Sequence, residues 1–254
     1  MKLEEKLKNK FLYNKNINIF KYLYFCYYKF FHKFNSNKSY STNGVDLLIS
    51  YLFKNKNEGI YIDVGCHHPI QGNNTFKLFQ KGWKGMNIDI DHHSIEMFNF
   101  FRPRDTNKQI AISDKVGESD LFFYHNKSKI NTLSEKIAKS RTTKPKEIKK
   151  VKTNTLNSVI ENSPIKDQKI NFINIDVEGY EMNVLQGFDI VKYYPDVVVI
   201  EYLDMEVKKL EFHNQNLEKI TNSKIYQFMK SKNYHFVNWL HSDLVFVSNN
   251  IRDI

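Results

Sequence analysis

The chain has 254 residues, which is enough for one large domain with a buried core. Its two cysteines exclude a disulfide framework and a cysteine-based metal site, so we expect a reducing compartment, the cytoplasm. The formal net charge of +10 is uneven, because residues 1–56 carry +8, residues 127–152 carry +8 and the remainder is acidic. This basicity reflects either the codon bias of an AT-rich genome or an anionic surface or polymer near those two segments.

The N-terminal segment 17–31 is rich in aromatic residues but is broken by Lys21 and Lys29. The chain contains no apolar run of about 20 residues, so no membrane span is predicted. Two interpretations remain: a helix that packs its aromatic face on the domain, which is favoured, and a helix that lies in a membrane interface. We therefore expect a basic, aromatic-rich helical extension over residues 1–43, and the second interpretation adds peripheral membrane contact through residues 17–31.

From residue 60 onward, apolar strands alternate with amphipathic helices. Strands are predicted at 59–65, 83–91, 108–114, 119–125 (added at an edge), 170–176, 196–203 and, as a pair, 234–249. Helices are predicted at 75–82, 94–101 (capped by Ser94), 154–161, 181–188 and 222–233. Between them, residues 127–152 lack sustained apolar periodicity and are interpreted as a basic, mobile or lid-like insertion.

This alternation predicts an α/β fold: a doubly wound, Rossmann-like and mostly parallel sheet with an antiparallel C-terminal edge, over residues 44–254. In such sheets, ligands bind beyond the carboxyl ends of the strands. The first strand ends in Asp63-Val64-Gly65, and the second ends in Asp89, 26 residues after Asp63, close to the spacing at which an acid binds a ribose. The third ends in Ile112-Ser113-Asp114, which suits the flank of an adenine ring. Together they predict an adenosine pocket.

Two common phosphate-binding patterns are absent from the sequence. Neither G-x-G-x-x-G nor G-x-x-x-x-G-K-[ST] occurs. One acid and one glycine in the first turn suit a cationic adenosine ligand without phosphates. S-Adenosylmethionine has this character, because its amine and its sulfonium are both positive.

Four stretches of the sequence then carry a family resemblance: "YIDVGCHHP…NNTFKLFQKGWKGMNID", "FNFFRPRDTNKQIAISD", "VKTNTLNSVIE" and "INFINIDVEGYEMNVLQGF". Together they resemble the FkbM-type S-adenosylmethionine-dependent methyltransferases over about Gly44 to Val247, and Asp-Val-Glu-Gly-x-Glu is the most specific piece. The resemblance implies a class I methyltransferase sheet and methyl transfer to a hydroxyl of a sugar or other small metabolite. The chain has His67-His68-Pro69 where the family often has Asn-x-Gly, which leaves the substrate open.

The carboxylates after the fourth core strand are candidates for the chemistry. Methyl transfer to a hydroxyl needs alignment and removal of a proton, so Asp176 or Glu178 is the candidate base, and His67 or His68 could share that role. A divalent cation held by two acids and a histidine is a less favoured alternative, and no metal ligand is assigned. The catalytic candidates are Asp176, Glu178 and His68, and the cofactor-binding candidates are Asp63, Gly65, Cys66, His67, Asp89, Ile90, Ile112, Ser113 and Asp114.

Several other residues have simpler interpretations. Glu181 is expected to complement a helix dipole, and Cys66 to pack rather than to react. Arg102 and Arg104 either contact an acidic substrate or lie in a solvated turn. Two other functions stay open: a nucleic-acid methyltransferase, encouraged by the basic segments but lacking the Asn/Asp-Pro-Pro-aromatic turn, and a non-catalytic adapter. We expect a small-molecule or glycan partner and no nucleic acid.

Overall fold

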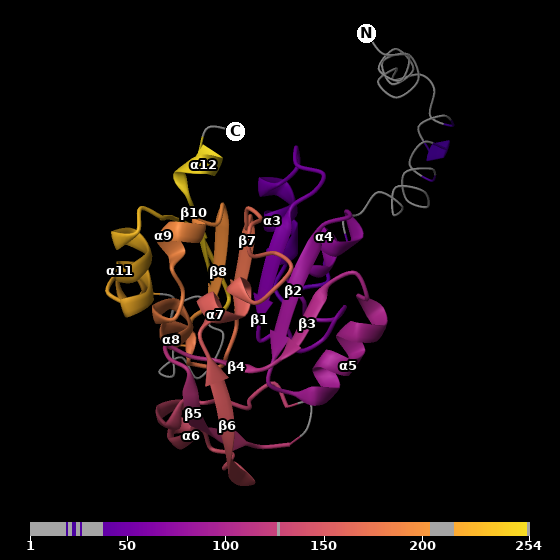
Figure 1. Ribbon diagram of the computed structural model, residues 1–254. Helices are drawn as coiled ribbons and strands as arrows, with labels where there is room; N and C mark the ends of the chain where they lie inside the picture. Colours follow the sequence, from indigo (N-terminus) through magenta and orange to yellow (C-terminus); the bar gives the residue numbers. More distant parts are fainter. Residues whose placement is uncertain are drawn as a thin grey trace. The chain divides into compact units, whose positions relative to one another are not determined.

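The computed structural model describes residues 38–125, 128–203 and 216–252, together with Ile19, Tyr22, Leu23 and Cys26 (Figure 1). The chain divides into two units, residues 1–38 and residues 39–254. The expected N-terminal extension and its membrane contact over 17–31 fall almost entirely outside the described residues, and both stay predictions. Within the described part of the chain, we find no helix of the length and apolar character that a membrane crossing requires.

The main sheet has seven strands in the order β3-β2-β1-β7-β8-β10-β9. Their bounds are Ile60–Val64 (β1), Lys84–Asp89 (β2), Thr106–Gln109 (β3), Phe172–Ile175 (β7), Val197–Glu201 (β8), His235–Leu240 (β9) and Asp243–Val247 (β10). Strands β3, β2, β1, β7 and β8 pair in parallel, and β10 is antiparallel to both β8 and β9. The predicted doubly wound sheet with an antiparallel C-terminal edge is confirmed.

Alternate side chains of the central strands enter two separate apolar cores, as the pleat of a sheet requires. In β1, Ile62 packs in the larger core, with α7, α8, α9 and α11, whereas Tyr61 packs on the opposite face, with α3 and α4. Apart from α6, which lies in the insertion, the described helices are α3 (Val45–Leu52), α4 (Phe76–Gln80), α5 (His92–Phe101), α7 (Leu156–Glu161), α8 (Glu181–Gln186), α9 (Ile190–Tyr193), α10 (Leu217–Thr221), α11 (Lys224–Ser231) and α12 (Asn249–Arg252). Helix α5 lies along β2 and β3 (Figure 1).

Helix α5 begins two residues earlier than the sequence predicts. Its N-cap is Asp91, whose side chain accepts a hydrogen bond from the backbone amide of Ser94 at 3.1 Å. Ser94 is therefore the third helical residue and not the cap, because Asp91 offers an equally good capping oxygen three positions earlier.

A second, three-stranded sheet has the order β4-β6-β5, with bounds Ala111–Ile112 (β4), Gly117–Phe123 (β5) and Glu147–Asn154 (β6). The predicted strand 108–114 is thus divided between the two sheets, and the predicted strand 119–125 pairs in the small sheet, not at an edge of the main one. The insertion over 127–152 contains helix α6 (Glu135–Ser140) and most of β6. Periodicity missed β6 because both of its faces are largely exposed. Figure 1 shows the small sheet beyond one end of the main sheet.

Candidate active site

A cavity of about 300 Å³ lies at the carboxyl ends of β1, β2, β7 and β8. The strand order reverses between β1 and β7, and this switch point is where open α/β sheets bind ligands. The small sheet also contributes to the wall, through Leu121 of β5 and Ile112 of β4. The cavity is therefore closed partly by the segment that follows β3.

The structure brings nine of the twelve predicted site residues to this cavity: Asp63, Gly65, Cys66, His67, Asp89, Ile90, Ile112, Asp176 and Glu178. The other three, His68, Ser113 and Asp114, are not among its lining residues. His68 Nδ1 accepts hydrogen bonds from the backbone amides of Ile70 and Gln71, so its lone pair is already used within the turn.

Ser113 and Asp114 leave the cavity for a topological reason. Ser113 is buried, and its amide donates to the carbonyl of Asn154, the last residue of β6. Asp114 is exposed and accepts a hydrogen bond from Ser113 Oγ, which lowers the pKa of Asp114. The chain passes from the main sheet to the small sheet at Ile110, so only Ile112 of the expected adenine rim keeps its place in the wall.

The turn after β1 is held tightly against its neighbours. Gly65 has φ of 81°, and a Cβ there would lie 1.7 Å from the carbonyl oxygen of Asp176, so no other residue fits without a backbone shift. The amides of Gly65 and Cys66 donate to the carbonyl of Ile88 at 2.8 and 3.1 Å. Burial raises the pKa of the Cys66 thiol well above its usual value, which keeps the thiol neutral and agrees with a packing role.

Asp89 ties the end of β2 to this turn. Its Oδ2 accepts the amide of His67 at 2.8 Å, and its Oδ1 accepts the amide of Asp91 at 2.7 Å. Burial raises the pKa of Asp89 to about 6, although both amides favour the ionised form. Each carboxylate oxygen keeps a second lone pair, so Asp89 can accept further hydrogen bonds from a ligand in the cavity.

Beneath the turn, Asp63 and Arg102 form a buried charge pair that is joined through neutral side chains. Asp63 is 1% exposed, and it accepts hydrogen bonds from Asn73, Thr75 and Asn174 at 2.9–3.0 Å. Arg102 is fully buried and donates to Thr75 Oγ1 and Asn73 Oδ1, each at 2.7 Å. Burial raises the pKa of Asp63, and the positive charge of Arg102 opposes this shift.

Arg102 also holds the loop that carries the two histidines. Its Nε donates to the carbonyl of Pro69 at 2.9 Å, and its guanidinium lies 4.9 Å from the centroid of the Phe98 ring. Both sequence-based interpretations of Arg102, a substrate contact and a solvated turn, are wrong, because the side chain is buried. No local signal separates Arg102 from Arg104, because Arg102 is the C-cap of α5 and its burial is decided by tertiary packing. Arg104 is exposed.

The loop after β7 adopts a backbone that L-residues rarely take. Glu178 has φ of 58° and Gly179 has φ of 93°. Of the five non-glycine residues with positive φ in the described part of the chain, three line the cavity: His67, Glu178 and His241. Such conformations persist only where the surroundings impose them, and they gather at functional sites.

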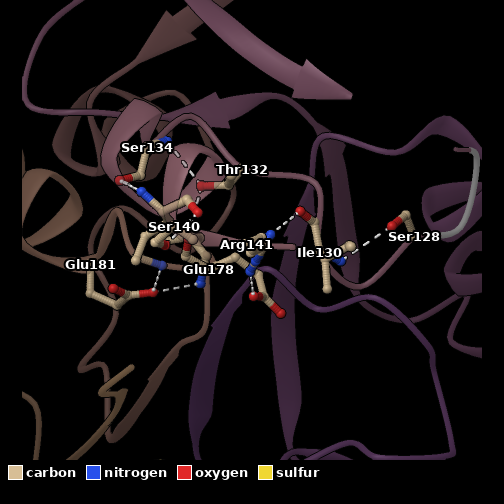
Figure 2. A network of polar contacts seen from close by, with 11 residues as sticks. Ser128, Ile130, Thr132, Ser134, Ser140, Arg141, Glu178 and Glu181 are labelled. Carbon is tan, nitrogen blue, oxygen red and sulfur yellow. Dashed lines mark hydrogen bonds and ion pairs between the residues drawn. The ribbon is translucent and has the colours of Figure 1, made fainter. Parts of the chain in front are cut away.

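Figure 2 shows what imposes this loop conformation. Glu181 Oε1 accepts the amides of Val177 and Gly179 at 3.1 and 2.9 Å, so Glu181 shapes the loop in addition to starting α8. From the insertion, Thr132 Oγ1 donates to the carbonyl of Glu178 at 2.8 Å, and Arg141 forms an ion pair with Oε2 of Glu178. The insertion therefore positions the acidic loop directly.

Three carboxylates meet where β7 and β8 end. One oxygen each from Asp176, Glu178 and Glu201 lie within 4.8 Å of one another. Burial raises the pKa of Asp176 to about 6 and that of Glu178 to about 7, and it raises the pKa of Glu201 well above its usual value. Glu201 was missed in the sequence analysis, although it is the last residue of an apolar strand, as Asp89 is. Asp243, the cross-strand partner of Glu201 in β10, adds a fourth acid to the wall.

Residues 63–236 match the family model for the methyltransferase FkbM domain. No curated protein matches the chain. Among solved structures, the fold is similar to a crystal structure of monomeric WbdD, with 14% sequence identity and a TM-score of 0.40. That alignment covers 86% of this chain and 44% of the WbdD chain, so the chain spans less than half the length of that protein.

We expect Arg102→Met to lower the free energy of unfolding by about 3–5 kcal/mol, because it leaves the buried Asp63 without its counter-charge. The control Arg104→Met changes an exposed side chain and should stay within about 0.5 kcal/mol. Urea denaturation at pH 7.5 measures both. Equal losses in the two variants would contradict a special role for Arg102.

The pH dependence of Arg102→Met gives a second check. Without the guanidinium, the pKa of Asp63 in the folded state rises further above its unfolded value. The folded variant then binds this proton more strongly than the unfolded chain, so its stability relative to the wild type should recover as the pH falls from 7.5 towards 5. A deficit that does not change with pH would show that lost packing, not charge, causes the destabilisation.

Proposed function

The chain belongs to the FkbM methyltransferase family, and on that premise we propose that it transfers a methyl group from S-adenosylmethionine to a hydroxyl oxygen of a sugar, a glycan or another small metabolite. The observation that carries the proposal is the cavity itself. It lies at the switch point of the sheet, and the described residues that line it include seven acids but one lysine, which suits a cationic ligand.

Different residues of the cavity suit the ribose, the adenine and the positively charged amine and sulfonium of S-adenosylmethionine. Asp89 has lone pairs free to accept the two ribose hydroxyls, since its two oxygens each accept one backbone amide. Ile90 and Ile112 supply apolar surface for the adenine. Asp63 and Asp176 place negative charge on the side where a positive amine and sulfonium would be stabilised. These matches support the cofactor assignment.

When bound, S-adenosylmethionine supplies an electrophilic methyl carbon, which bonds to the acceptor oxygen while the carbon–sulfur bond breaks and leaves its electron pair on sulfur. The chain must align the hydroxyl and accept its proton. We assign the proton to Asp176, because Glu178 is engaged by Arg141, and the proton then passes to solvent. We assign no catalytic role to His68, since its Nδ1 already accepts hydrogen bonds from two backbone amides of the turn.

The acidic wall also favours one class of acceptor. Asp176, Glu178 and Glu201 stand together at the end of β7 and β8, where the acceptor has to approach. A polynucleotide would bring phosphates against these charges, whereas a sugar presents neutral hydroxyls that donate to carboxylates. We therefore propose a neutral, hydroxyl-bearing acceptor, not a nucleic acid.

Calorimetric titration with S-adenosylhomocysteine tests the cofactor assignment. We expect binding that weakens between pH 7 and pH 5, because the pKa of Asp89 is about 6 and the ionised carboxylate is the better acceptor for ribose hydroxyls. Binding should reach a plateau above pH 7. Asp89→Asn should weaken binding about tenfold, as expected for losing a hydrogen bond to a charged group, and should remove most of this pH dependence.

Asp114→Asn is the matched control for that experiment. It removes a carboxylate that the sequence also assigned to the cofactor but that lies outside the cavity. Its affinity and pH profile should equal those of the wild type. If neither S-adenosylmethionine nor S-adenosylhomocysteine binds the wild-type protein, the proposed function fails.

We expect Asp176→Asn to lower turnover by about 10²–10⁴-fold, the usual contribution of a general base. Transfer of labelled methyl groups to a panel of sugars and glycans measures turnover. Glu161→Gln, an exposed acid paired with Lys192, is the control and should keep its activity. A wild-type rate in Asp176→Asn would remove Asp176 from the chemistry.

A further inference from the structure

The acidic cluster at the acceptor side of the cavity is only partly neutralised. It comprises Asp176 and Glu178 in the loop after β7 and Glu201 at the end of β8. Arg141 is paired with Oε2 of Glu178, and among the residues that the structure describes Lys129 is the one lysine that lines the cavity. Packing several carboxylates together away from water is unfavourable unless further positive charge or protons are present.

Glu201 supplies a second and independent observation. The residue is 8% exposed and lines the cavity. Its Oε2 atom is buried and has no hydrogen-bond partner among the residues that the structure describes. Buried carboxylate oxygens are nearly always paired, so an unpaired one in a functional cavity needs an explanation, and a bound ion is one of them. The cross-strand neighbour, Asp243, is itself an acid and cannot serve as a counter-charge.

We propose that Asp176, Glu178 and Glu201 bind a divalent cation of the type that prefers oxygen ligands. One ligand oxygen from each lies within 4.8 Å of the others. Two oxygens bound to the same Ca²⁺ can be separated by at most about 4.6–5.2 Å, twice the metal–oxygen distance, and the corresponding limit for Mg²⁺ is about 4.0–4.2 Å. An oxygen–oxygen separation of up to 4.8 Å thus admits an ion of the size of Ca²⁺. Oxygens that stand 4.8 Å apart would have to move closer to bind Mg²⁺.

The chemistry of the ligands narrows the class of metal. The three ligands are all carboxylates, with no thiolate or imidazole among them. Zn²⁺ sites usually include nitrogen or sulfur, whereas Mg²⁺, Mn²⁺ and Ca²⁺ accept carboxylates and water. Three protein ligands leave coordination positions open for water or for an oxygen of the acceptor.

The role of the ion rests on the proposed function. A hydroxyl bound to a divalent cation loses its proton more readily, and the ion would also fix the position of the acceptor oxygen. The carboxylate of Asp176 has two oxygens, so it can bind the ion with one and receive the proton with the other. The site was not assigned from the sequence because Glu201 reaches the other two acids only through the pairing of β7 with β8.

Binding of Mn²⁺, followed by electron paramagnetic resonance at pH 7.5, tests the site directly. We expect one Mn²⁺ to bind to each chain, with Ca²⁺ and Mg²⁺ as competitors. Glu201→Gln keeps the size of the side chain but removes its charge, and it should weaken Mn²⁺ binding at least about tenfold. Glu161→Gln, the exposed acid outside the cavity, should bind Mn²⁺ as the wild type does.

Two results would overturn the site: no saturable binding of millimolar Mn²⁺ by the wild type, or equal affinity in the wild type and Glu201→Gln. In the first case, a proton shared between the carboxyl groups neutralises the cluster. Asp176→Asn serves as the second variant if Glu201→Gln does not fold, and it should weaken Mn²⁺ binding to a similar degree. Calorimetry with S-adenosylhomocysteine separates the two proposals. If Mn²⁺ binds but S-adenosylhomocysteine does not, the cation site is supported and the proposed methyl transfer is refuted. If S-adenosylhomocysteine binds but Mn²⁺ does not, only the cation site is refuted.

Discussion

The buried pairing of Asp63 with Arg102 is the constraint on which the cavity depends. It joins the end of β1 to the residue that follows α5, by way of Asn73 and Thr75 in the intervening loop. A guanidinium without solvent contact is costly unless its donors are satisfied, and here its bond to the carbonyl of Pro69 extends the network into the turn. The turn can therefore hold a fixed shape while its outer side stays available to a ligand.

The acids of the site separate into two groups with different environments. Asp63 accepts hydrogen bonds from three side-chain donors, and these bonds and the charge of Arg102 oppose the rise in pKa that burial causes. Among the described residues, Asp176 and Glu201 have no comparable set of donors: burial raises the pKa of both, the hydrogen bond between them lowers only that of Asp176, and the neighbouring carboxylates raise that of Glu201 further. A protein keeps such under-neutralised charge where something else supplies the compensation. The contrast identifies the end of β7 and β8 as the chemical side of the cavity.

Sequence patterns predicted the parts of the site that depend on strand ends, because parallel strands bring their carboxyl ends to one edge. Asp63, Asp89 and Asp176 were found in this way. The same patterns could not distinguish Arg102 from Arg104. Arg102 is buried and Arg104, two positions later, is exposed, and this difference is decided by tertiary packing. The patterns also misplaced Ser113, because a strand that passes from one sheet into another has no local signature.

The basic insertion acquires a specific meaning from these contacts. Its Arg141 binds Glu178, and Ile137 of α6 stands so close to Gly179 that a Cβ there would lie 2.3 Å from its Cγ1. The loop after β7 is thus shaped on one side by Glu181 and on the other by the insertion. Any displacement of this segment would both open the cavity and remove a positive charge from the acidic cluster. One set of contacts therefore controls both access to the cavity and the charge of the acidic cluster. A ligand that adds positive charge to the cluster would compensate for the loss of Arg141. Displacement of the insertion and binding of such a ligand are thus thermodynamically linked.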